Sequence, residues 1–168
     1  MYQVYLGLGT NLGDRIDNLS RAVDEITKIG PIDAISSIYE TEPVGMDGAD
    51  NFLNLVLSIK TTDDPPLLLV RLKKIEKKIG GRPHHHMESR IIDIDVLLYR
   101  GLAYHDHTIQ VPHPRLHLRR FALEPLNEIA PTAIHTTLEK TIATILRQCR
   151  DQHKVIKSEY QLAQMIHQ

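Results

Sequence analysis

The sequence predicts an α+β protein with a ferredoxin-like βαββαβ core, two helices on one face of a mainly antiparallel sheet, and a C-terminal helical extension. Three observations predict it. Strand-like and helix-like apolar patterns follow one another in the order strand, helix, strand, strand, helix, strand. Glycines and prolines separate these segments. The length of 168 residues fits one domain, which we expect over residues 1–160 with a tail over 161–168.

The first half of the core is bounded by turn residues. Residues 2–8 form a short aliphatic and aromatic run that predicts a buried strand. From Asp14 onward, apolar residues recur at helical spacing until Gly30 and Pro31 end the helix. Residues 32–40 are rich in β-branched side chains and predict a second strand, which a loop over 41–50 follows.

The second half repeats this arrangement. Residues 52–59 predict a strand with one fully apolar face, because leucines and isoleucine alternate along it. A helix is predicted from the acidic and proline-rich start at residues 63–66 to Gly80 and Gly81. Residues 92–99 alternate again and predict the fourth strand.

The remaining residues predict an extension of this core. Residues 101–111 could add a hairpin strand, and residues 118–126 and 136–149 have helical patterns. Thr136 and Glu139 have the spacing of a capping box at the start of the second of these helices. Residues 161–168 are expected to form a loose helical tail.

Composition excludes several functional classes. The formal net charge is -1, so the chain lacks the overall basic field of a general nucleic-acid binder. Its single cysteine excludes an intramolecular disulfide and a cysteine-based zinc site. The longest apolar runs are far too short to cross a membrane, and no signal peptide is visible. We therefore expect a cytoplasmic protein.

Two aspartates on the fourth predicted strand carry the strongest chemical signal. Asp93 and Asp95 are two residues apart, so their carboxylates should lie side by side on one face of the strand. Two like charges there favour a divalent cation with oxygen ligands between them. The alternative is an ordinary solvent-facing pair of acids. The nearby arginines 82 and 90 favour a polyphosphate site, because guanidinium groups bind phosphate oxygens.

Common nucleotide motifs are missing. The glycines of residues 7–13 do not have the Rossmann spacing, so a strand-to-helix turn is the better interpretation, and no P-loop is present. The run His84-His85-His86 could bind a metal, although adjacent side chains on an extended loop point apart. His113 lies between Pro112 and Pro114, which should fix the direction of its ring. A plain surface histidine is the alternative.

The two phenylalanines stand out because aromatic residues make up only 5% of the chain. Phe52 and Phe121 could both belong to the core. Alternatively, they could hold a flat heterocycle between their rings, with the Asn54 amide at its edge. Before Phe121, arginines 115, 119 and 120 form either a solvated charge run or a phosphate contact.

Taken together, these residues resemble the family of 6-hydroxymethyl-7,8-dihydropterin pyrophosphokinases. The resemblance covers roughly residues 4–131 in five ordered blocks. Its most specific block is the arginine followed by Asp-x-Asp within residues 90–98. The other blocks are Gly9-Thr10-Asn11-Leu12-Gly13, residues 41–45, residues 52–54, and residues 111–126.

The resemblance implies transfer of diphosphate from ATP to the hydroxymethyl group of the pterin, leaving AMP, in folate biosynthesis. It implies that two Mg²⁺ ions bind Asp93 and Asp95, which act in catalysis with Arg82 and Arg90. The implied pterin contacts are Thr41, Val44, Phe52, Asn54 and Phe121. The implied ATP contacts are Glu76, Arg82, Arg90, His113 and Arg119. We expect a monomer, with a dimer as the alternative, that binds neither nucleic acid nor membrane.

This chain departs from the family pattern just before the Asp-x-Asp block. Met87 stands where a tryptophan is common, and Glu88-Ser89 replaces the usual Gly-Pro. Two other classes of protein are alternatives to an enzyme. An RNA-binding module of this fold would need exposed sheet aromatics, which the sequence lacks, and a metal-binding regulator would rest on the histidine run.

Overall fold

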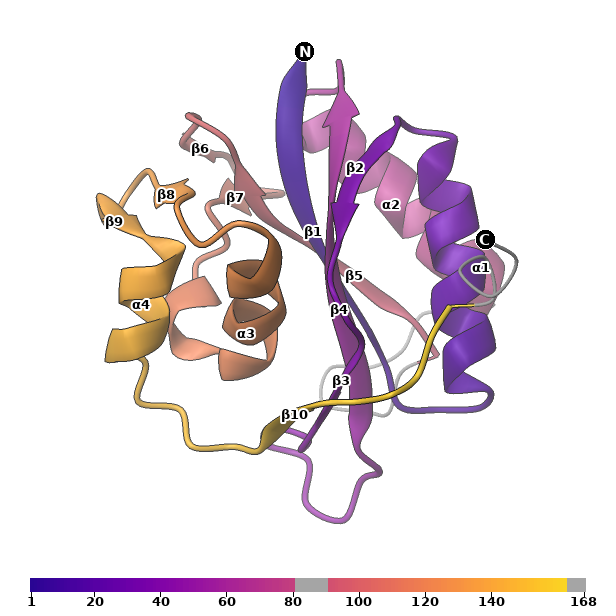
Figure 1. Cartoon of the computed structure of the whole chain (residues 1–168). Helices are drawn as coiled ribbons and strands as arrows, with labels where there is room; N and C mark the ends of the chain where they lie inside the picture. The colour runs from indigo at the N-terminus through magenta and orange to yellow at the C-terminus, as the bar shows by residue number, and fades with distance from the viewer. Residues whose placement is uncertain (81–90, 163–168) are drawn as a thin grey trace.

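A computed structural model describes residues 1–80 and 91–162 of the chain (Figure 1). The predicted βαββαβ order is confirmed, with the second predicted strand divided in two. The elements of this core are β1 (Tyr2–Thr10), α1 (Arg15–Thr27), β2 (Ile32–Ile35), β3 (Tyr39–Thr41), β4 (Phe52–Thr61), α2 (Pro65–Gly80) and β5 (Asp93–Tyr99).

The single strand predicted over residues 32–40 is wrong, and Ser36 explains the division. The backbone N–H of Val56 on β4 donates to the Ser36 hydroxyl at 2.9 Å. The Ser36 N–H in turn donates to the Val56 carbonyl at 2.8 Å. A side-chain oxygen thus takes the place of a backbone acceptor, so the ladder along β4 is interrupted between β2 and β3.

The sheet is antiparallel and has the order β10-β3-β4-β1-β5, with β2 also paired to β4. β10 (Val155–Lys157) comes from the C-terminal extension. On β1, which lies between β4 and β5, Gly9 is opposite Asn54 of β4 on one side and Asp93 of β5 on the other. This register places residues that are distant in sequence in one row across the sheet.

Helices cover both faces of the sheet. α1 and α2 cover one face, as predicted, while α3 (Arg120–Ile129) covers the other and α4 (Ile142–Gln148) packs on the outer side of α3 (Figure 1). Each face has its own apolar core. Val4, Leu6 and Leu8 of β1 pack in the first core, whereas Tyr5 packs in the second. The two-residue alternation of a strand therefore feeds both cores.

The extension begins with the predicted hairpin and helix. The hairpin consists of β6 (Tyr104–His105) and β7 (Gln110–Val111). A short 3-10 turn, Leu116–Leu118, leads into α3, so the helix predicted over 118–126 begins two residues later and extends further. Leu162, beyond α4 and β10, is 2% exposed in the first core. The domain boundary expected at residue 160 stays a prediction, and residues 163–168 lie outside the described residues.

The helix predicted over 136–149 is wrong in its first half. β8 (Ile134–His135) and β9 (Lys140–Thr141) form a hairpin there, and α4 begins only after it. Glu139, the expected capping-box acid, has a φ of 57°, which is left-handed and not helical. The Leu138 N–H donates to His135 Nδ1 at 3.0 Å, so the His135 ring organises the turn. The true cap of α4 is Thr141, which accepts from the Thr144 N–H at 3.2 Å.

Within residues 1–80 and 91–162, every helix is too short or too polar to span a bilayer.

Candidate active site

One cavity of about 480 Å³ lies on the α3 face of the sheet. It brings together every described candidate residue except Glu76. These residues are Thr41, Val44, Phe52, Asn54, Asp93, Asp95, His113, Arg119 and Phe121. Arg82 and Arg90, and the histidine run at 84–86, lie outside the described residues, so their expected roles stay predictions.

Two glycines of β1 form the floor of this cavity. Gly7 and Gly9 both line it. A Cβ added at Gly9 would lie 2.6 Å from Asn54 Oδ1, and one added at Gly7 would lie 3.3 Å from Leu97 Cδ1. The strand predicted over residues 2–8 is confirmed for Gly7, whereas the turn expected from Gly9 onward is wrong for Gly9, because β1 continues to Thr10. Both glycines lie within the strand, where the missing side chains leave room above the sheet.

An aromatic end of the cavity is formed by Phe52 at the start of β4 and Phe121 in the first turn of α3. Both rings are half-buried, so neither is a fully buried core residue. The Arg119 guanidinium carbon lies 5.6 Å from the centre of the Phe121 ring. This distance is within the range of a cation–π contact.

Asn54 and Thr41 supply fixed polar groups beside these rings. Both residues are buried, and Asn54 Nδ2 donates to Thr41 Oγ1 at 2.6 Å. The bond connects neighbouring strands, since Thr41 belongs to β3 and Asn54 to β4. A buried amide held in this way has a defined orientation toward the cavity.

The acidic end of the cavity is formed by Asp93 and Asp95 on β5. Both line the cavity, while Ile94 between them is 3% exposed in the first core. The prediction that the two carboxylates share one face of the strand is therefore confirmed. Arg119 Nη1 lies 4.0 Å from Asp95 Oδ2, which places a cation between the acidic and aromatic ends.

Glu76 lies beside the acidic pair without lining the cavity. It belongs to α2, and its Oε2 accepts from the backbone N–H of Ile94 at 3.1 Å. Burial raises the pKa of Glu76 to about 7, and the neighbouring Asp93 adds to that rise, against Lys73 and the Ile94 N–H, which lower it. The structure therefore places Glu76 against Asp93 from the opposite face of the sheet.

His113 is held by backbone contacts at the edge of the cavity. The backbone N–H of His113 donates to the Leu97 carbonyl at 2.9 Å, and the ring Nδ1 of His113 accepts from the backbone N–H of Arg115 at 3.1 Å. Burial, followed by the positive charges of Arg119 and Arg115, lowers the pKa of His113 to about 4, although Asp93 opposes this shift. The ring is therefore neutral near pH 7, with its proton on Nε2.

The arginines at 115, 119 and 120, near the start of α3, do not all face the cavity. Arg115 and Arg119 line the cavity. Arg120 points away and donates to the carbonyls of Asp151 and Cys149. Sequence reasoning did not separate these residues, because only the helix start fixes which of them face the sheet. It also assigned no role to Glu42 and Met46, which line the cavity from the loop after β3. Glu42 lies within the block at 41–45, whereas Met46 carries no motif signal.

The fold and the cavity together indicate a phosphoryl-transferring enzyme that acts on a flat heterocycle. Comparison with known proteins agrees. The model of the 7,8-dihydro-6-hydroxymethylpterin-pyrophosphokinase family matches residues 5–131, and the chain belongs to this family. It is accordingly an enzyme, a pyrophosphokinase of folate biosynthesis.

Named relatives support this assignment along most of the chain. The 2-amino-4-hydroxy-6-hydroxymethyldihydropteridine pyrophosphokinase of Aquifex aeolicus is 41% identical over 142 residues, which are 84% of this chain and 89% of that protein. The protein of the same name from Bacillus subtilis is 38% identical and covers 74% of this chain and 76% of that one.

Solved structures show the same fold. A Plasmodium falciparum HPPK-DHPS structure matches with a TM-score of 0.72 and 19% identity over 88% of this chain. An HPPK-DHPS crystal structure in complex with substrates matches with a TM-score of 0.68 and 20% identity. This chain spans 45% and 43% of those longer chains, respectively.

Proposed function

We propose that the cavity holds both substrates of the family's reaction. The pterin, 6-hydroxymethyl-7,8-dihydropterin, would occupy the aromatic end, and the phosphates of ATP would occupy the acidic end. The observation that carries this proposal is the coexistence of both ends in one cavity on a rigid sheet. The products would be AMP and the pterin diphosphate.

The aromatic end suits a flat, polar-edged ring. Phe52 and Phe121 would stack on its two faces, since aromatic rings gain stability from stacking with heterocycles. Asn54 and Thr41 would bind its polar edge, and Val44 would cover it from the loop after β3. A ring clamped in this way directs its hydroxymethyl group toward Asp93 and Asp95.

The acidic end suits magnesium bound together with ATP. Among the described residues no cluster of three or more His, Cys, Asp or Glu side chains could hold a metal alone. Two carboxylates completed by substrate phosphates are the usual ligands of Mg²⁺ in kinases, so Asp93 and Asp95 fit this group. We propose that they hold two ions. When bound, magnesium neutralises the charge of the phosphates.

The remaining candidates would bind ATP. Arg119 and His113 line the cavity next to the acidic pair, and the Nε2–H of His113 can donate to a phosphate oxygen. Glu76 stands behind Asp93, and we keep it, with Arg82 and Arg90, as a proposed ATP contact. These groups would position the phosphates, which is the main source of rate acceleration in phosphoryl transfer.

The proposed reaction is an in-line displacement at the β-phosphorus of ATP. The hydroxymethyl oxygen forms a bond to this phosphorus, and the bond from the β-phosphorus to the α–β bridging oxygen breaks. AMP leaves with that oxygen, and the hydroxyl proton is released to solvent. We assign no general base, since catalysis by positioning and charge neutralisation needs none.

The test separates diphosphate transfer from ordinary phosphate transfer. Purified enzyme is incubated with ATP, Mg²⁺ and the reduced pterin, and the nucleotide product is identified by chromatography. We expect AMP in equal amount to the pterin diphosphate, and no AMP when the pterin is omitted. Formation of ADP, or AMP release without pterin, would contradict the proposal.

The cavity and the substrates also bear on the oligomeric state and the cellular compartment of the enzyme. We propose that the enzyme acts as a monomer, because one chain supplies both ends of the cavity. We propose the cytoplasm as its compartment, because the reaction consumes ATP. Light scattering of the purified protein tests the first statement: a dimer at working concentration would contradict it.

A further inference from the structure

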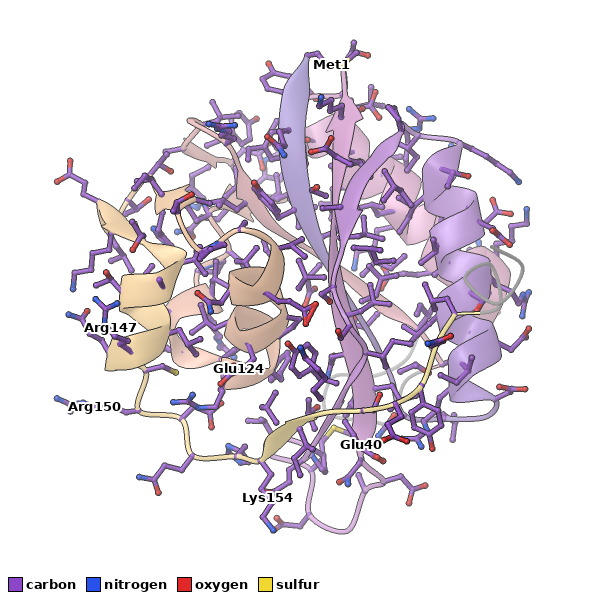
Figure 2. The ribbon with its side chains drawn as sticks, in the orientation of Figure 1. Met1, Glu40, Glu124, Arg147, Arg150 and Lys154 are labelled. Atoms are coloured by element: carbon purple, nitrogen blue, oxygen red, sulfur yellow. The ribbon has the colours of Figure 1, made fainter. Side chains whose placement is uncertain are left out.

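A C-terminal segment connects the two walls of the cavity. Residues 151–157, which we call the strap, run from α4 on one face to the edge of the sheet at β3 (Figure 1). Figure 2 labels Glu124 on α3, Lys154 on the strap and Glu40 on β3 in succession along the lower part of the view. The strap lies beyond residue 131, where the match to the family model ends.

At its first residue the strap fixes the start of α3. The residue preceding α3, Arg119, makes no side-chain cap, so the first N–H groups of the helix need another acceptor. Asp151 provides it: its Oδ2 accepts from the Arg120 N–H at 3.0 Å. The Arg120 side chain in turn donates from Nε to the Asp151 carbonyl at 2.8 Å. Arg120 is flanked by Arg119 and Phe121, which both line the cavity.

The Asp151 side chain is itself held in place by the strap. Its Oδ1 accepts from the His153 N–H at 3.0 Å and lies 2.5 Å from His153 Nδ1. One carboxylate thus bonds to the strap through one oxygen and to α3 through the other. Such a doubly bonded carboxylate fixes the position of α3 relative to the strap.

Further along, the strap fixes the opposite wall. The Glu42 N–H donates to the Lys154 carbonyl at 3.1 Å, and the Lys154 N–H donates to Glu42 Oε1 at 2.8 Å. The next residue, Val155, lies opposite Thr41 in the β10–β3 ladder. Thr41 and Glu42 both line the cavity.

We propose that the strap is a positioning element for the pterin, and that Asp151 is its main positioning residue. Asp151 holds the wall that carries Phe121, and the Lys154 main chain holds the wall that carries Thr41. A clamp kept at a fixed width binds a flat ring without losing further conformational freedom. The inference rests on the proposed pterin site and adds a role for a segment that contacts neither substrate.

The first experiment changes the α3 wall. Asp151→Ala removes the acceptor for the Arg120 N–H, so we expect the pterin KM to rise by about fivefold, the equivalent of one lost cap. The KM for ATP and kcat should change less. Asp151→Asn keeps an oxygen for this N–H and should restore most of the pterin KM. Gln152→Ala, an exposed neighbour, is the matched control and should behave as wild type.

The second experiment changes the loop wall without substituting a residue that lines the cavity. Lys154→Pro removes the N–H that donates to Glu42, and a proline is tolerated just before an edge strand. We expect the pterin KM to rise here as well. Lys154→Ala keeps the N–H and loses only an exposed side chain, so it should keep the wild-type pterin KM.

The outcomes distinguish the strap from the proposed function. If wild-type enzyme forms no AMP from ATP and pterin, the proposed function itself fails. If wild-type enzyme is active and Asp151→Ala and Lys154→Pro lower only the melting temperature, with an unchanged pterin KM, the strap is structural and the inference is overturned. If Asp151→Ala does not fold, the comparison of Lys154→Pro with Lys154→Ala decides alone.

Discussion

Single residues set the width and polarity of the cavity. Gly9 is the clearest example, because a side chain there would meet Asn54 Oδ1 at 2.6 Å and displace the amide bonded to Thr41. At the other end, Asp93 and Asp95 face the cavity only because Ile94 between them is buried in the first core. The chemistry of the site thus depends on which side of a strand each residue occupies.

The first prediction concerns the aromatic clamp. Phe121→Ala should weaken pterin binding by about 1–3 kcal/mol, the scale of lost stacking on a heterocycle. ATP binding should change less, because Phe121 lies at the aromatic end. Two fluorescence or calorimetric titrations measure this. An equal loss of both ligands would mean that Phe121 serves the fold and not the pterin.

The second prediction concerns the acidic pair. Asp95→Asn should reduce turnover by orders of magnitude, because an amide is a poor ligand for Mg²⁺ compared with a carboxylate. Its melting temperature should be equal or slightly higher, since one of two adjacent like charges is removed. Pterin binding should survive better than Mg²⁺–ATP binding. Near-normal turnover would refute the metal assignment.

The third prediction concerns acid stability. Because burial lowers the pKa of His113 to about 4 from 6.5, the unfolded chain takes up a proton before the folded chain as pH falls. The free energy of unfolding should therefore decrease between pH 6.5 and about 4, by on the order of 1–3 kcal/mol for this partly exposed ring. Urea unfolding at pH 7 and pH 4.5 measures it.

His113→Gln is the control for this effect. The buried His135, whose pKa burial also lowers, is present in both proteins, so the difference in pH dependence isolates His113. The variant should lose less stability on acidification than wild type. Identical losses would show that His113 titrates normally in the folded protein.

At the scale of elements, the β8–β9 hairpin shows how a local motif can mislead. Thr136 and Glu139 have capping-box spacing, yet the His135 ring and carbonyl accept the N–H groups of Leu138 and Glu139, and the chain turns. The capping-box spacing indicates only which side chains would cap a helix if a helix began at this point. The competing turn was not visible because a histidine acceptor is no standard turn signal.

The fourth prediction follows from this turn. Glu139→Gly should stabilise the protein by about 0.5–1 kcal/mol, because glycine adopts a φ of 57° without steric cost. A thermal melt should show a higher midpoint. Glu139→Ala keeps the steric cost and should give no such gain. If both variants melt alike, the left-handed conformation contributes no strain.

At the scale of the whole molecule, one sheet separates two cores. The first core lies under α1 and α2, and the second lies under α3 and α4 (Figure 1). The cavity belongs to the second face, because α3 supplies Phe121 and the residue before it supplies Arg119. We therefore expect packing on that face to affect both stability and pterin binding, whereas packing in the first core should affect stability and leave pterin binding unchanged.

The fifth prediction compares the two cores. Leu123→Ala in the second core and Leu68→Ala in the first should each lower the free energy of unfolding by about 2–5 kcal/mol, since both side chains are fully buried. Only Leu123→Ala should also weaken pterin binding, measured well below the melting temperature. Equal effects of both variants on pterin binding would contradict this division.

Much of the fold could be predicted because strands and helices follow from the local alternation and spacing of apolar residues. The alternation at 92–99 determines that Asp93 and Asp95 share a face, and the helical spacing before Gly30 and Gly80 determines α1 and α2. The family blocks likewise named Phe52, Asn54 and Phe121, which the structure brings into one cavity. Each of these predictions depends on residues that are close to one another in the sequence.

The tertiary structure alone decided the features that depend on contacts between distant segments. The register of β1 between β4 and β5 makes Gly7 and Gly9 the floor of the cavity. The packing of α3 separates Arg119 from Arg120, and the strap joins Asp151 to α3 across 31 positions of sequence. A local pattern fixes the periodicity of one segment, but the relative placement of segments comes from burial and hydrogen bonding summed over the whole chain.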